Sequence, residues 1–136
     1  MHNACRPMPD YCYKITPGLR IVEEWYSGLI GVEYINQCLE NMSRDKNFDP
    51  AFDIIVDFSD AVFDESCKSL DMLGQAAECH DRANLDSRSK TAVIVNSPFT
   101  TACAMLFLRR ASTRNMEIFS TREAAEKWIG SRPAES

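Results

Sequence analysis

A short apolar run that ends in an acidic residue constrains the fold of this chain more than any other stretch. Residues 52–58 read Phe-Asp-Ile-Ile-Val-Asp-Phe, with three β-branched residues in a row at their centre. Such a run is typical of a strand that is covered on both faces in a parallel sheet. The polar residues 59–68 that follow predict a loop leading into a helix. Ligands and partners of open α/β sheets bind at the loops after the strands, so we expect the functional site here.

The residues before this run predict a β-hairpin. Residues 11–16 and 19–26 alternate between apolar and polar side chains and contain many β-forming residues. Between them, Thr16-Pro17-Gly18-Leu19 has proline and glycine at the positions that a tight turn favours. Ser27, Gly28 and Gly31 are expected to end the second strand.

Apolar periodicity and capping residues predict the remaining elements. Val32, Ile35, Leu39 and Met42 recur at spacings of three and four, which gives one apolar helical face. The elements expected after residue 58 are a helix from Asp64 or Ser66 to about Arg82, a strand at 91–95, a helix from Phe99 to about Arg114, a strand at 116–119, and a helix that follows the capping box of Ser120 and Glu123 and ends at Gly130.

The resulting order, β-β-α-β-α-β-α-β-α, predicts an α/β fold. We expect a mixed sheet of about five strands with an N-terminal β-hairpin and about four helices. Residues 11–130 are expected to form a single domain, flanked by a flexible arm at 1–10 and a flexible tail at 131–136.

Charge and cysteine usage argue against several classes of protein. The net charge of −5 argues against nucleic acid as a partner, because a phosphate backbone needs a basic surface. The first ten residues contain two prolines and no apolar signal segment, which predicts a cytoplasmic protein with free thiols. The two histidines and six cysteines include no Cys-x-x-Cys pair, so we expect no metal site and no cofactor. Residues 91–108 are uncharged, yet Asn96-Ser97-Pro98 within them predicts a strand end and a helix start rather than a transmembrane segment.

The order of elements and two segments resemble a known family. Residues 48–57 read Phe-Asp-Pro-Ala-Phe-Asp-Ile-Ile-Val-Asp, and the closing segment 117–128 contains Phe119, two adjacent alanines and Trp128. Over about residues 11–130 the chain resembles the SpoIIAA-like branch of the STAS superfamily, whose founding members are bacterial anti-sigma-factor antagonists. The resemblance implies a non-enzymatic regulatory or protein-interaction domain with an unknown protein partner.

The antagonists carry a phosphorylated serine at the start of the helix after the central strand. Ser66 holds the matching position, whereas Glu65, Cys67 and Lys68 depart from the family pattern. The resemblance implies a phospho-switch at Ser66, because nearly two added negative charges beside acidic residues would repel an acidic partner. A serine at this point is also a common helix cap, and both interpretations stay open. The residues assigned to this switch and partner loop are Asp57, Ser59, Asp60, Asp64, Glu65, Ser66 and Lys68.

The helix expected from Phe99 is apolar nearly all round, which exceeds what a helix with one solvent face needs. One interpretation is a surface for a lipid or another apolar small molecule, or for a membrane, since SpoIIAA-like proteins are similar in fold to the CRAL-TRIO lipid carriers. The other is the interface of a homodimer, with the arginines placed at a helix C-terminus. The residues assigned to this surface are Phe99, Met105, Leu106, Phe107, Leu108, Arg109 and Arg110.

An enzyme is the third class of function, and the sequence argues against it. Asp57, Asp60, Asp64 and Glu65 could hold a magnesium ion. However, the five glycines are scattered and form no phosphate-binding loop, and two histidines, one of them in the N-terminal arm, assemble no Ser-His-Asp set. We therefore expect no catalytic residues.

Overall fold

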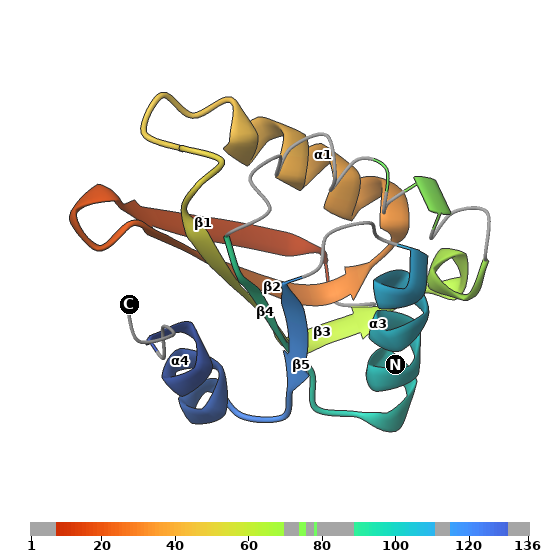
Figure 1. The fold of residues 1–136 in the computed structure, drawn as a ribbon. Helices are drawn as coiled ribbons and strands as arrows, with labels where there is room; N and C mark the ends of the chain where they lie inside the picture. The colour runs from red at the N-terminus through yellow and green to blue at the C-terminus, as the bar shows by residue number, and fades with distance from the viewer. Residues whose placement is uncertain (1–7, 70–73, 76–77, 79–88, 111–114, 131–136) are drawn as a thin grey trace.

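The computed structural model describes residues 8–69, 74–75, 78, 89–110 and 115–130 of the 136-residue chain. In this part of the chain it shows an α/β fold built on one five-stranded sheet (Figure 1). The strands are β1 (Asp10–Thr16), β2 (Ile21–Ile30), β3 (Asp53–Phe63), β4 (Thr91–Ile94) and β5 (Met116–Phe119). They lie side by side in chain order. The β1–β2 pair is antiparallel and the other pairs are parallel, which confirms the predicted mixed sheet with an N-terminal hairpin.

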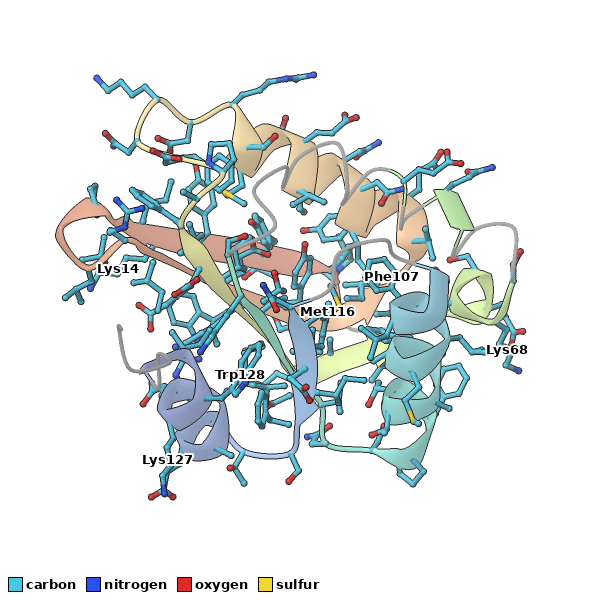
Figure 2. The ribbon with its side chains drawn as sticks, viewed as in Figure 1. Lys14, Lys68, Phe107, Met116, Lys127 and Trp128 are labelled. Atoms are coloured by element: carbon cyan, nitrogen blue, oxygen red, sulfur yellow. The ribbon has the colours of Figure 1, made fainter. Side chains whose placement is uncertain are left out.

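In the described part of the chain, three α-helices pack on the two faces of this sheet: α1 (Val32–Ser43), α3 (Pro98–Arg110) and α4 (Arg122–Gly130). Val56 and Phe58 of β3 share a core with Val32 of α1 and Cys103 of α3. The odd-numbered Ile55 packs instead with Ala125 of α4. Because successive side chains of a strand point to opposite faces, α1 and α3 cover one face and α4 covers the other. Figure 2 shows Trp128 on the side of α4 that faces the sheet.

The central strand is buried on both faces, as its β-branched run predicts. Ile54, Ile55 and Val56 are all buried, and each contributes to one of three apolar clusters. Two 3-10 helices complete the described elements, η1 (Pro17–Leu19) in the hairpin turn and η2 (Glu65–Lys68) after β3. No helix of the described chain is long and apolar enough to cross a membrane.

The prediction that Ser27 and Gly28 end the second strand is wrong, whereas Gly31 does follow its last residue. β2 continues to Ile30, with a register shift against β3 between Trp25 and Ser27. Gly28 adopts a φ of +80°, and a Cβ at this position would overlap the backbone oxygen of Met8. Glycine at this position therefore lets the strand pass beside the Met8 backbone and continue instead of ending.

The predicted loop at residues 59–68 is also wrong in its first half. β3 extends through Ser59 and Asp60 to Phe63, and its last residues pair with the extended part of β2. Ala61 and Phe63 are buried, so the additional length is stabilised by apolar packing. The helix predicted from Asp64 or Ser66 to about Arg82 is described only in η2 and in the helical residues 74, 75 and 78. Its other residues lie outside the described part of the chain, as do residues 1–7, 111–114 and 131–136.

Candidate functional site

The residues assigned to the switch loop occupy two separate places in the structure. Asp57, Ser59 and Asp60 lie within β3, whereas Asp64 and the residues after it follow the end of that strand. The Asp57 carboxylate accepts a hydrogen bond from the backbone N–H of Ser59 at 2.8 Å. Lys68 and Glu65 form an exposed ion pair at 3.5 Å, which contributes little to stability. The structure therefore does not bring the seven predicted residues together on one loop.

Ser66 caps α1, a helix that precedes it in the chain. Its hydroxyl accepts a hydrogen bond from the backbone N–H of Val32, at the start of α1, at 3.0 Å. The same hydroxyl donates to the Asp64 carboxylate at 2.6 Å, and that carboxylate also accepts from the Ser66 backbone N–H at 2.8 Å. Gly31, the residue before α1, has no side chain that could cap the helix. Ser66 thus joins the end of β3 to α1, and its role as a phospho-switch stays a prediction.

The predicted apolar helix is divided between the core and the surface. Leu106, Phe107 and Leu108 are partly buried against the core between the sheet, α1 and α3. Phe99 and Met105 remain 38% and 53% exposed. α3 includes Arg109 and Arg110, whose side chains lie outside the described part. One part of the apolar surface of α3 therefore packs against the core, and another part is exposed to solvent.

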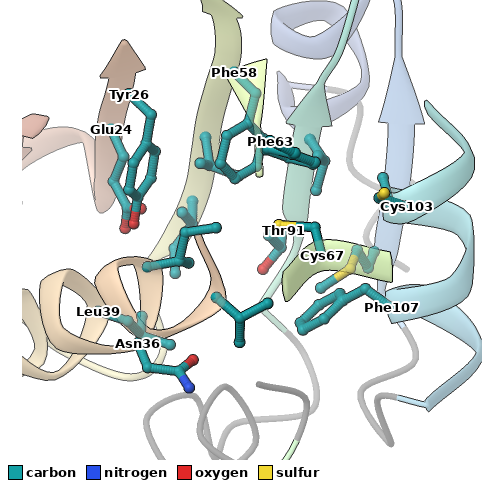
Figure 3. Close-up of a pocket in the computed structure, with 17 residues that line it drawn as sticks. Glu24, Tyr26, Asn36, Leu39, Phe58, Phe63, Cys67, Thr91, Cys103 and Phe107 are labelled. Atoms are coloured by element: carbon teal, nitrogen blue, oxygen red, sulfur yellow. The ribbon is translucent and has the colours of Figure 1, made fainter. Parts of the chain in front are cut away.

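A cavity of about 110 Å³ lies between α1 and α3, over the sheet (Figure 3). We call it the α1–α3 cavity. Its lining is mostly apolar and comes from the sheet and both helices, including Val56, Val93, Met116, Leu39, Ala104 and Phe107. Figure 2 shows Phe107 on the side of α3 that faces Met116. Protein interiors contain few voids larger than a water molecule, so a cavity of this size is a candidate binding site.

Glu24 is an acidic residue in this apolar lining, and sequence reasoning missed it. The residue is only 4% exposed, and its Oε2 atom has no hydrogen-bond partner among the described residues. Burial raises the pKa of this carboxyl to about 8, because a carboxylate loses its hydration in an apolar site. The signal was present in the sequence: Glu24 lies between Val22 and Tyr26, on the alternating apolar face of its strand.

Aromatic rings extend the apolar surroundings of Glu24 along the sheet. The ring centroids of Tyr11 and Tyr26 are 4.7 Å apart, and those of Tyr26 and Phe58 are 4.9 Å apart. The pKa values of both tyrosines are raised, mainly by burial and then by the nearby Glu24 carboxyl. Burial also raises the pKa of the Cys67 thiol, which lines the cavity, to about 12. This thiol is therefore neutral and a poor nucleophile at neutral pH.

A second polar cluster lies on the opposite face of the sheet, around Arg122 at the start of α4. Its guanidinium is 2.5 Å from Glu23, 3.0 Å from Glu126 and 3.5 Å from Asp57. The same group lies over the ring of Trp25, 5.3 Å from its centroid. These contacts hold the first turn of α4 against β2 and β3. Among the described residues, no three His, Cys, Asp or Glu side chains are grouped to hold a metal ion.

The chain was compared with family models, curated proteins and solved structures, and no match was found in any of them. The resemblance to the STAS superfamily therefore stays a prediction. Function is inferred from the side chains of the α1–α3 cavity and of the Ser66 cap.

Proposed function

We propose that this domain is a non-enzymatic binding module that takes up a small apolar molecule in the α1–α3 cavity. The observation that carries the proposal is the apolar cavity itself, lined by two helices and the sheet. At about 24 cal/mol per Å³, an empty cavity of this size costs about 2–3 kcal/mol of stability. A ligand that fills it recovers part of this cost.

The size of the cavity selects the kind of ligand. An engineered cavity of about 150 Å³ in another protein binds benzene. The α1–α3 cavity, at about 110 Å³, suits a single ring or a short aliphatic chain and is too small for a whole lipid. Binding is favoured over catalysis because the lining is mostly apolar and the Cys67 thiol is held neutral. The proposal thus narrows the apolar-ligand hypothesis from a lipid carrier to a small-molecule site.

Toluene binding to matched variants tests this proposal. Ala104 lines the cavity, whereas Ala102 is exposed on the same helix. We expect wild type and Ala102→Leu to bind toluene with a Kd on the order of 0.1–1 mM, as seven non-hydrogen atoms allow. Ala104→Leu should bind at least tenfold more weakly, because its added methyl groups occupy the cavity. Failure of wild type to bind toluene, in calorimetry and in NMR titration, would contradict the proposal, and so would equal binding by the two variants.

We also propose, as a second candidate function, a STAS-like regulatory domain that is switched at Ser66. The predicted element order and the mixed sheet with its N-terminal hairpin support it. The specific observation in its favour is that the Ser66 hydroxyl bonds the first N–H of α1, a helix that lines the cavity. A phosphoryl group would replace the hydrogen bond that Ser66 donates to Asp64 with repulsion between two anions. This change would loosen the start of α1.

The intact mass of the protein purified from its native host tests the switch. A stoichiometric phosphoryl group that is lost in Ser66→Ala and retained in Ser59→Ala supports it. An unmodified mass under every growth condition argues against it. The homodimer and the protein partner also stay predictions, since nothing in the described structure shows what covers the exposed Val62, Phe99 and Met105.

A further inference from the structure

The chemistry of one polar atom in the α1–α3 cavity specifies the ligand further. The Oε2 atom of Glu24 is buried and has no hydrogen-bond partner among the described residues, and Glu24 lines the cavity. Figure 3 shows the Glu24 side chain among the lining residues, at the end of the cavity beside Tyr26. A buried acceptor without a donor is costly, and native proteins rarely contain one without a functional reason.

The described protein groups around Glu24 supply no positive charge. Tyr11 and Tyr13 lie next to it on β1, Tyr26 lies on β2, and Cys38 lies on α1. All four are neutral at neutral pH, since their pKa values are raised. The Tyr13 hydroxyl already donates to Asp45 at 2.7 Å and is not directed to Glu24. A cation that would stabilise the ionised form of this carboxyl therefore has to come with the ligand.

We propose that the ligand of the α1–α3 cavity is a small amine, whose apolar part fills the cavity and whose ammonium group donates a hydrogen bond to the Glu24 carboxylate. The inference rests on the proposed function, since it assigns the ligand class of the same cavity. An ammonium group satisfies the unpaired Oε2 atom and balances its charge at once. A neutral hydroxyl would satisfy the hydrogen bond alone, and a carboxylic acid would place a second acid beside the first.

Proton balance distinguishes an amine from a neutral donor. With a pKa of about 8, the free carboxyl of Glu24 holds a proton at pH 7 most of the time. An ammonium ligand stabilises the carboxylate, so this proton leaves to the buffer as the ion pair forms. Binding of an amine should therefore release close to one proton per ligand at pH 7. Binding of an alcohol should release none.

Titration calorimetry with benzylamine, benzyl alcohol and toluene tests the inference. Wild type and two variants, Glu24→Gln and Glu33→Gln, are titrated at pH 7 in two buffers of different ionisation enthalpy. Glu33 is exposed on α1 and serves as the matched control for removal of an acid. We expect wild type to bind benzylamine at least tenfold more tightly than toluene, with release of close to one proton. Glu24→Gln should lose this preference and the proton release while it retains toluene binding. Glu33→Gln should keep both.

The outcomes separate this inference from the proposal on which it rests. Toluene binding without a preference for benzylamine in wild type overturns the amine assignment and leaves the apolar site in place. A preference for benzyl alcohol over benzylamine, or benzylamine binding without proton release, overturns it as well. Loss of all binding in wild type overturns the proposed function itself.

Discussion

Replacement of Glu24 by glutamine should change how the stability of the protein depends on pH. Folding raises the pKa of this carboxyl from 4.5 to about 8, because the side chain is buried. Between these two values the folded protein holds a proton that the unfolded chain lacks. The free energy of unfolding therefore falls by about 1.4 kcal/mol for each pH unit of increase. The contribution of the protonated carboxyl is fully present below pH 4.5 and is lost as the pH rises through about 8.

The expected magnitude follows from the size of this shift. The whole shift corresponds to about 5 kcal/mol, of which about 2–3 kcal/mol is lost between pH 5 and pH 7. Glu24→Gln has no proton to lose, so it should become more stable relative to wild type by this amount over the same interval. Urea unfolding followed by circular dichroism at pH 5, 6, 7 and 8 measures the difference. Glu33→Gln, which removes an exposed acid, should follow wild type.

Parallel pH profiles for wild type and Glu24→Gln would refute this reasoning. They would mean that the Glu24 carboxyl titrates near its usual value and is therefore hydrated or paired in the folded protein. The Oε2 atom of Glu24 would then not be an unpaired acceptor, and the argument for an amine ligand would be refuted.

Two further substitutions test the contacts that hold the fold. Arg122→Gln should destabilise the protein by about 1–2 kcal/mol, because it removes two partly buried ion pairs, an exposed ion pair with Glu126 and a ring contact. The substitution of exposed Lys127 by glutamine should leave stability unchanged in the same urea unfolding measurement. Gly28→Ala should lower the free energy of unfolding by about 1–3 kcal/mol, because the φ of Gly28 is +80° and the added Cβ overlaps the backbone oxygen of Met8. Gly18→Ala is the control: its Cβ meets nothing within 4 Å, so it should change the unfolding midpoint little. If Arg122→Gln and Lys127→Gln changed the free energy of unfolding equally, the role given to the Arg122 contacts would be contradicted. Equal changes in Gly28→Ala and Gly18→Ala would contradict the role given to Gly28.

Local patterns in the sequence correctly predict the central strand of the sheet. The run Ile54, Ile55 and Val56 indicates a doubly covered strand because β-branched residues on both faces of a strand need apolar cover, and all three are buried. The same reasoning fails at Gly28, where the strand continues to Ile30. Whether a glycine ends a strand or bends it depends on the chain that passes beside it, here at Met8.

The candidate site depends even more on tertiary contacts. Ser66 is recognisable as a cap in the sequence, but the N–H group that it caps belongs to Val32, 34 residues earlier. The alternation of β2 places Glu24 on an apolar face, but only the packing of α1 over that face buries its carboxyl. The α1–α3 cavity results from the sizes of side chains on several elements, so it cannot be predicted from the sequence of any one segment.

Intermolecular NOEs between toluene and the methyl groups of the protein test the central claim most directly. A ligand in the α1–α3 cavity should show NOEs to the methyl groups of Ala104, Val56 and Val93, which line it, and none to the exposed Ala102. NOEs confined to surface methyl groups such as those of Val62, or no NOEs at millimolar toluene, would show that the cavity does not bind apolar molecules and would contradict the account.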